Sequence, residues 1–70
     1  MNHEQHVRQW VLQSSGLRIE PMMGRYLLDQ AKCATAPAIA VMGGDARTGV
    51  PVRRIIPAAQ LKSVVEGLNS

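Results

Sequence analysis

Three arginines are concentrated in one stretch of the chain, where their guanidinium groups could bind an anion. Arg47, Arg53 and Arg54 follow one another closely, and Asp45 is the only acidic residue among them. Guanidinium groups recognise phosphate and carboxylate oxygens through paired hydrogen bonds. The stretch therefore predicts a surface for a polyanion or an acidic partner. Ordinary solvated arginines, which keep a strand edge from pairing, are the competing interpretation.

Neighbouring residues of a strand point to opposite faces of its sheet. If Arg53 and Arg54 lie in a strand, one of them is exposed and the other pairs with an acid or lies in an interface. Arg25 and Met22, on a predicted helix, complete the candidate binding residues. Met22 is expected to be exposed because Met23 carries the apolar stripe of that helix, and methionine adapts to irregular partner surfaces.

Two patterns come close to known chemical motifs and fail on spacing. The segment from Gly44 to Gly49 has the two glycines of a phosphate-binding loop, but Val50 and Pro51 stand where the motif needs lysine and a hydroxyl residue. A wide hairpin turn is the expected structure. His3 and His6 are three residues apart, whereas the zinc-protease helix motif places its two histidines four apart, and no third ligand follows. Histidines three apart can still meet on a helix face, but at a helix end they are expected to be solvated. We therefore predict no metal site.

Nothing in the sequence predicts catalysis or a cofactor. The acidic residues are dispersed, so no carboxylate pair is available for general acid–base chemistry. Cys33 is expected to be a small, partly buried hydrophobic residue rather than a nucleophile. A chain of this size is also expected to enclose only a shallow pocket, well short of several hundred Å³. The prediction is a protein that is not an enzyme.

Length and composition indicate one small domain over residues 1–70. The chain has 70 residues, 46% of them hydrophobic, with a net charge of +3 and a pI near 9.8. A core of this size supplies at most about 3–5 kcal/mol, so a partner or a covalent staple is expected. Cys33 has no second cysteine to pair with, which indicates a reducing compartment. With no long apolar run and no signal-peptide pattern, we expect a cytoplasmic protein without a membrane span.

The pattern of apolar residues predicts an α+β fold in the order α-(β)-α-β-β-α. Helical spacing predicts helices at 2–14, 21–34 and 57–68. Residues 17–20 are expected to be a short strand or an extended link. A hairpin is predicted from the strands 38–42 and 50–56 and the turn 43–49.

Within the first helix, Asn2 and Gln5 are spaced as a capping box, and Gly16 suits the left-handed conformation after the last turn. Val7, Trp10, Val11 and Ser14 should face the core. In the second helix the predicted core face contains Met23, Tyr26, Leu27, Gln30 and Ala31. Core packing is favoured for Trp10 over a role as a binding hot spot.

The predicted hairpin has apolar side chains on both faces, through 39–42 and 55–56. A lone hairpin is marginally stable in water. We therefore expect a third strand, either from residues 17–19 or from a second copy of the chain, and we predict a homodimer that covers the surplus apolar surface.

The element order is superficially similar to a winged helix, with the basic hairpin as the wing. That architecture needs a further recognition helix between Pro21 and the hairpin, and none is available. The leading hypothesis is a small adaptor, regulator or inhibitor that acts by protein–protein contact. The alternative is a basic nucleic-acid-binding regulator that contacts phosphates through the arginine-bearing hairpin.

Overall fold

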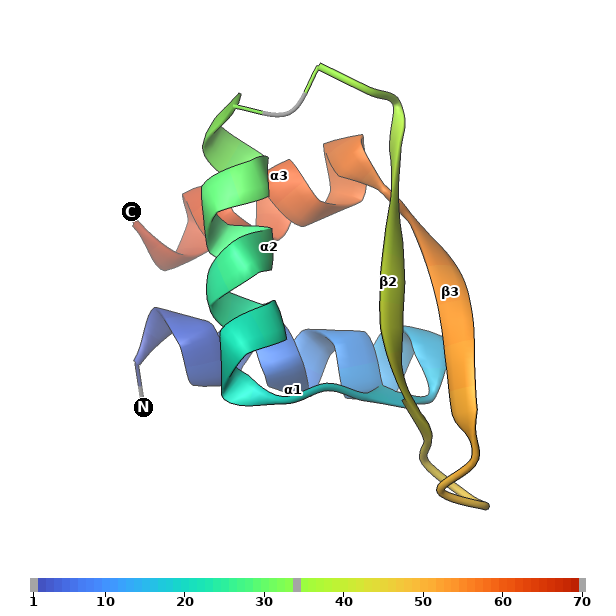
Figure 1. Cartoon of the computed structure of the whole chain (residues 1–70). Coiled ribbons are helices and arrows are strands. Elements are labelled where there is room, and N and C mark those ends of the chain that lie inside the picture. The colour runs from blue at the N-terminus through green and yellow to red at the C-terminus, as the bar shows by residue number, and fades with distance from the viewer. Residues whose placement is uncertain (1, 34, 70) are drawn as a thin grey trace.

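The computed structural model describes residues 2–33 and 35–69 and shows three helices packed on one side of a three-stranded antiparallel sheet (Figure 1). The predicted α+β order is confirmed, and residues 17–18 supply the third strand from the same chain. The bounds are α1 His3–Ser15, β1 Leu17–Arg18, α2 Pro21–Cys33, β2 Ala38–Asp45, β3 Pro51–Pro57 and α3 Ala58–Leu68. Residue 34, the predicted end of the second helix, lies outside the described residues.

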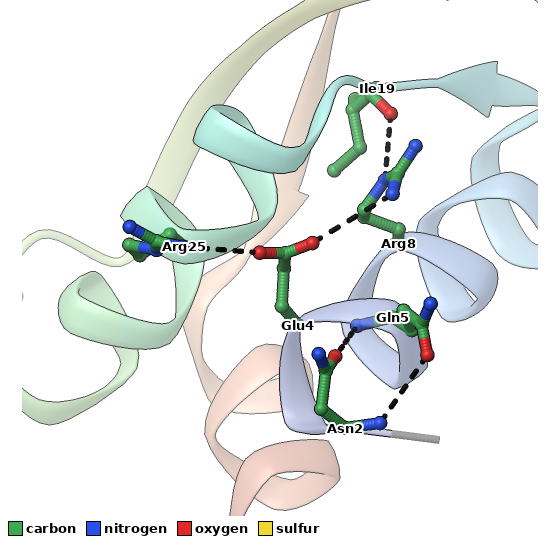
Figure 2. Close-up of polar contacts among 6 residues, drawn as sticks. All are labelled: Asn2, Glu4, Gln5, Arg8, Ile19 and Arg25. Atoms are coloured by element: carbon green, nitrogen blue, oxygen red, sulfur yellow. Dashed lines mark hydrogen bonds and ion pairs between the residues drawn. The ribbon is translucent and has the colours of Figure 1, made fainter.

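Helix α1 spans His3–Ser15, one residue later at each end than the predicted 2–14, and both predicted caps are present. The backbone N–H of Gln5 donates to Asn2 Oδ1 at 2.8 Å, and Gln5 Oε1 accepts from the Asn2 N–H at 3.4 Å, which is a capping box (Figure 2). At the other end Gly16 has a φ of 61° and donates its N–H to Leu12 O at 3.0 Å. This left-handed cap turns the chain directly into β1.

The sheet has the order β1-β2-β3, so β2 is the central strand. Strand β1 pairs with the last residues of β2, with Arg18 opposite Gly44, and β3 pairs with β2 along its length. A Cβ atom on Gly43 would lie 2.6 Å from the carbonyl oxygen of Arg18. Glycine at position 43 is therefore what lets β1 approach the hairpin this closely.

The predicted hairpin is correct, but β2 is longer and the turn shorter than the sequence indicates. Residues 43–45, predicted as part of the turn, continue β2, and the chain reverses between Asp45 and Pro51. Glycines disfavour strands, which is why the sequence pattern ends the strand too early. Pairing with β1 and β3 on the two sides holds this segment extended.

The core lies between the helices and one face of the sheet. Its fully buried side chains are Leu17, Leu27, Ile56, Leu61, Val7, Val11 and Val41. Trp10 is partly buried and packs against this cluster, which confirms its predicted core role. Ser14 is exposed, and its hydroxyl donates to Trp10 O at 2.8 Å, so its predicted place on the buried face is wrong.

Helices α1 and α2 approach closely at a glycine. A Cβ atom on Gly24 would lie 2.8 Å from Cγ of Arg8 and 3.1 Å from Cγ of Glu4. The Glu4 carboxylate lies between two cations, 3.8 Å from Arg8 and 3.7 Å from Arg25 (Figure 2). Arg8 Nε also donates to Ile19 O at 3.0 Å, which ties the β1–α2 connection to α1.

The crossing at Gly24 explains why the predicted core face of α2 is partly wrong. Tyr26, expected to be buried, is 45% exposed, whereas Gly24 and Leu27 are buried. The contact with α1 rotates the buried face toward Gly24. Within the described part of the chain, none of the helices has the length and apolar character required to cross a bilayer.

Candidate functional site

One face of the sheet has no helix against it in the described residues, and we call it the outer face. Burial alternates along β2 and β3, because Ile39, Val41 and Ile56 point toward the helices and their neighbours point away. On the outer face Met42 is 61% exposed and Ile55 is 64% exposed. Figure 1 shows all three helices on the opposite side of β2 and β3. The predicted surplus of apolar surface on the hairpin is therefore confirmed.

A shallow groove of about 470 Å³ lies where the outer face meets the first turn of α2. Three methionines line it, Met22, Met23 and Met42, and the backbone around Gly44 and Pro51 contributes the rest of the apolar wall. Its volume contradicts the expectation of a pocket well short of several hundred Å³. The expectation is wrong because it considers an enclosed cavity, whereas this groove lies open between two elements.

The adjacent arginines of β3 have different environments, as their strand position predicts. Arg53 is exposed on the outer face, opposite Met42 in the register. Arg54 points to the other face, and its guanidinium lies 3.4 Å from the carboxylate of Asp45. The prediction that one arginine of the pair is exposed and the other meets an acid is confirmed.

Asp45 organises the turn at the end of the hairpin. Its Oδ1 accepts the backbone N–H groups of Arg47 at 2.8 Å and Thr48 at 3.1 Å, while Gly49 adopts a φ of 75°. These two backbone hydrogen bonds hold the pKa of the Asp45 carboxyl below its usual value, and the bond from Arg47 has the larger effect. The positive charge of Arg54 lowers the pKa further. The loop is thus a hairpin turn, as the sequence predicts.

The five sequence-predicted binding residues do not form one cluster. Arg47 is exposed at the hairpin tip, and Arg53 lies on the outer face. Arg54 is held by its carboxylate on the helix side of the sheet. Arg25 points toward Glu4 of α1, so it lies with the helix pair and away from the hairpin arginines (Figure 2).

Met22 is in the position that the sequence predicts for it. It is 83% exposed, the largest value among the exposed bulky apolar side chains, while Met23 is partly buried against the core. Because Met22 lines the groove together with Met42, the first turn of α2 and the outer face form one apolar surface. We call this combination the groove surface.

Sequence reasoning missed Arg18, which belongs to this surface. Arg18 is exposed on β1, pairs with Gly44 across the strands, and lines the groove. Glu20 is the acidic residue that lines the same groove. The alternation of Leu17, Arg18 and Ile19 was the available signal, because it predicts that Arg18 points away from the core.

Other chemically reactive side chains lie apart from the groove. Cys33 is exposed, contrary to the partly buried position predicted for it, and its thiol donates to Asp29 O at 3.2 Å. His3 and His6 are exposed on α1. Across residues 2–33 and 35–69, no group of three or more histidine, cysteine or acidic side chains is placed to hold a metal ion.

Comparison with solved structures shows that the fold occurs within a larger protein. The chain is similar to part of MreB 5 of Spiroplasma citri, in its crystal structure bound to AMPPNP, with a TM-score of 0.74 and 14% sequence identity. The match covers 93% of this chain and 21% of the MreB 5 chain, so this chain spans about a fifth of that protein. At this identity the likeness shows the fold alone. No protein-family model and no curated protein sequence matches the chain.

Proposed function

We propose that the protein is a non-catalytic binding module, an adaptor, regulator or inhibitor that docks on another protein through the groove surface. The observation that supports this proposal most directly is the exposure of Met42 and Ile55 on a sheet face that the described helices leave open. Exposed apolar side chains that continue from one element to the next are typical of protein interaction sites. Met22 extends the apolar area onto α2.

The pairing of apolar and cationic side chains favours a protein over a nucleic acid. Arg18 and Arg53 lie on the same face as Met42 and Ile55, and interface centres combine methionine and arginine in this way. Trp10 packs against the core, and the described outer face contributes no aromatic ring on which bases could stack. A single exposed thiol at Cys33 fits the reducing cytoplasm, which we propose as the compartment.

A homodimer remains our prediction for the free protein, with the outer face as the interface. The face is made of one short hairpin, and a stable interface usually covers about 800 Å² on each partner. Self-association through this face alone is therefore expected to be weak. Sedimentation velocity at increasing protein concentration measures this self-association. Weak dimers form at roughly tens of micromolar, so a protein that is entirely monomeric at that concentration would contradict the predicted dimer.

The proposal is tested by affinity capture from the native host after nuclease treatment, with wild-type protein and two variants as bait. Ile55→Asp places a charge on the outer face. Ala59→Asp is the control, because Ala59 is an exposed apolar residue in the first turn of α3 and does not line the groove. Proteins that bind through the groove surface should be lost with Ile55→Asp and retained with Ala59→Asp.

The same experiment separates the alternative function. If the protein acts on a nucleic acid, capture should disappear after nuclease treatment and should weaken steeply with salt for both variants and for wild type. Equal recovery of partner proteins with wild type and Ile55→Asp would contradict the proposed surface.

A further inference from the structure

Gly44 forms part of the groove, at a position where the fold does not need a glycine. It lies on the outer face between Arg18 of β1 and Pro51 of β3. A Cβ atom at this position would meet its nearest neighbour, Gly49 O, at 3.6 Å, which is an ordinary contact. Glycine weakens a strand interior, and where it is found there it often marks the close approach of a ligand or another backbone.

The neighbouring Gly43 shows the contrast. It points to the other face, where β1 leaves no room for a side chain. The absence of a side chain at Gly43 therefore has a structural reason, whereas at Gly44 its effect is to keep the groove open. The flexible thioether side chains of Met22 and Met42 line the groove beside Gly44, and they can adapt to the shape of a bound apolar side chain.

The charges around the groove favour an acidic guest. Arg18 lines the groove, and Arg53 lies on the same face opposite Met42. Neither arginine forms an ion pair with another described residue, unlike Arg54 with Asp45. Glu20 is the acidic group that lines the groove, so the two arginines leave this face with a surplus of positive charge.

We propose that the groove binds an extended acidic segment of a partner protein, which inserts one bulky apolar side chain over Gly44 and places carboxylates against Arg18 and Arg53. The inference rests on the proposed function and specifies its partner. A volume of about 470 Å³ is within the range of small-molecule sites, so the groove has room for one bulky side chain. Arginine pairs with carboxylates through two parallel hydrogen bonds, which would orient the segment along the face.

The test is a selection of random peptides displayed on phage, with the intact protein immobilised. Enriched peptides are then synthesised, and their affinities are measured by fluorescence anisotropy. We expect sequences in which one bulky apolar residue lies between aspartates or glutamates. Their affinity should fall at least about tenfold for Gly44→Leu, which fills the groove, and for the charge reversal of Arg18 and Arg53 to Glu.

Gly44→Ala provides a second variant in case Gly44→Leu does not fold. Its methyl group has room in the structure, so it should keep the fold by circular dichroism and weaken peptide binding less than Gly44→Leu. Ala59→Asp, which adds a charge on α3 away from the groove, should bind the peptides as wild type does. A labelled DNA duplex measured in parallel should bind weakly, and stronger DNA binding that persists in Gly44→Leu would overturn the inference.

The remaining outcomes distinguish this inference from the proposed function. Enriched peptides without acidic residues, or with unchanged affinity for Gly44→Leu, would overturn the acidic-segment inference. If Ile55→Asp still abolished their binding, the proposed function would stand. A selection that enriches no peptide, together with partner capture that Ile55→Asp leaves unchanged, would overturn both.

Discussion

The guanidinium of Arg54 donates to Asp45 Oδ2 at 3.4 Å, across the hairpin and near its tip. The same carboxylate accepts two backbone N–H groups of the turn, from Arg47 and Thr48. One side chain therefore holds the turn and connects it to β3. Strand alternation points Arg54 to the helix side of the sheet, where it meets Asp45, and leaves Arg53 as the arginine of the pair that the outer face presents.

The first prediction concerns the pH dependence of this turn. The pKa of Asp45 is below its usual value in the folded chain because of the two backbone hydrogen bonds and the charge of Arg54. A lowered pKa means that the unfolded chain binds the proton more tightly, so the stabilisation is present above the unfolded pKa and is lost as the pH falls through the folded pKa. Asp45→Asn should lower the melting temperature at neutral pH.

The difference between wild type and Asp45→Asn should shrink at about pH 3, below the usual aspartate pKa. Thermal unfolding followed by circular dichroism at the two pH values measures it. The interpretation is wrong if the two proteins show the same dependence of melting temperature on pH.

The second prediction uses two adjacent glycines as a matched pair. Gly43→Ala would bring a methyl group against the Arg18 carbonyl and force β1 to move, so it should destabilise the fold by about 1–3 kcal/mol. Gly44→Ala has room and removes an unfavourable strand glycine, so it should stabilise by up to about 1 kcal/mol. Urea unfolding measures both free energies, and a similar loss in the two variants would contradict the close approach of β1.

Local signals in the sequence predict the helix ends and the side-chain alternation. Both caps of α1 depend only on residues a few positions apart, so the sequence alone predicts them. They are the capping box at Asn2 and Gln5 and the left-handed Gly16. The opposite directions of Arg53 and Arg54 follow from strand geometry alone. Residues 17–19 are one of two predicted sources of the third strand, and only the observed pairing of Leu17 and Arg18 with β2 decides between them.

The errors concern contacts between segments that are distant in the sequence. Helical spacing places Tyr26 in the core, but the α1 contact at Gly24 sets which face of α2 is buried. The groove could not be predicted, because Arg18, Met22 and Gly44 come from three elements that only the folded chain brings together.

The third prediction tests the packing of α1 against α2 at Gly24. Alanine is a better helix former than glycine by about 1 kcal/mol, so Gly24→Ala would stabilise an isolated helix. In the folded chain its methyl group would press on the side chains of Arg8 and Glu4. We therefore expect a net destabilisation of about 1–3 kcal/mol.

Gly67→Ala is the control for this substitution, because Gly67 lies in α3 and a methyl group added there would meet no neighbouring side chain or distant backbone within 4 Å. It should be neutral or stabilise by up to about 1 kcal/mol. Thermal unfolding compares the two, with about 4–8 °C expected per kcal/mol for a domain of this size. A gain of stability for Gly24→Ala would show that Arg8 and Glu4 move aside at no cost.

The fourth prediction concerns the free edge of β3. The Asp45 N–H donates to Val50 O at 2.9 Å, and bonded pairs alternate along an antiparallel ladder. The N–H groups of Arg53 and Ile55 therefore point away from β2, and the other two outward positions are Pro51 and Pro57, which have no N–H. The edge thus offers few donors to another strand.

Self-pairing of this edge is also opposed by charge. If the β3 strands of two copies paired antiparallel along their full length, the pairing would be centred on Arg54. Arg53 of one copy would then lie opposite Ile55 of the other, and the two Arg54 side chains would lie directly opposite each other. Like charges in opposite positions destabilise a strand pair. The double variant Pro51→Thr with Arg54→Thr restores one of the two missing donors and removes the opposed charges. It should associate more strongly than wild type, as a concentration-dependent rise in sedimentation coefficient. Arg47→Thr removes the same charge in the turn, outside the strands and the outer face, so it should sediment as wild type does. If the double variant also matched wild type at every concentration, Pro51 and Arg54 would not be what protects this edge.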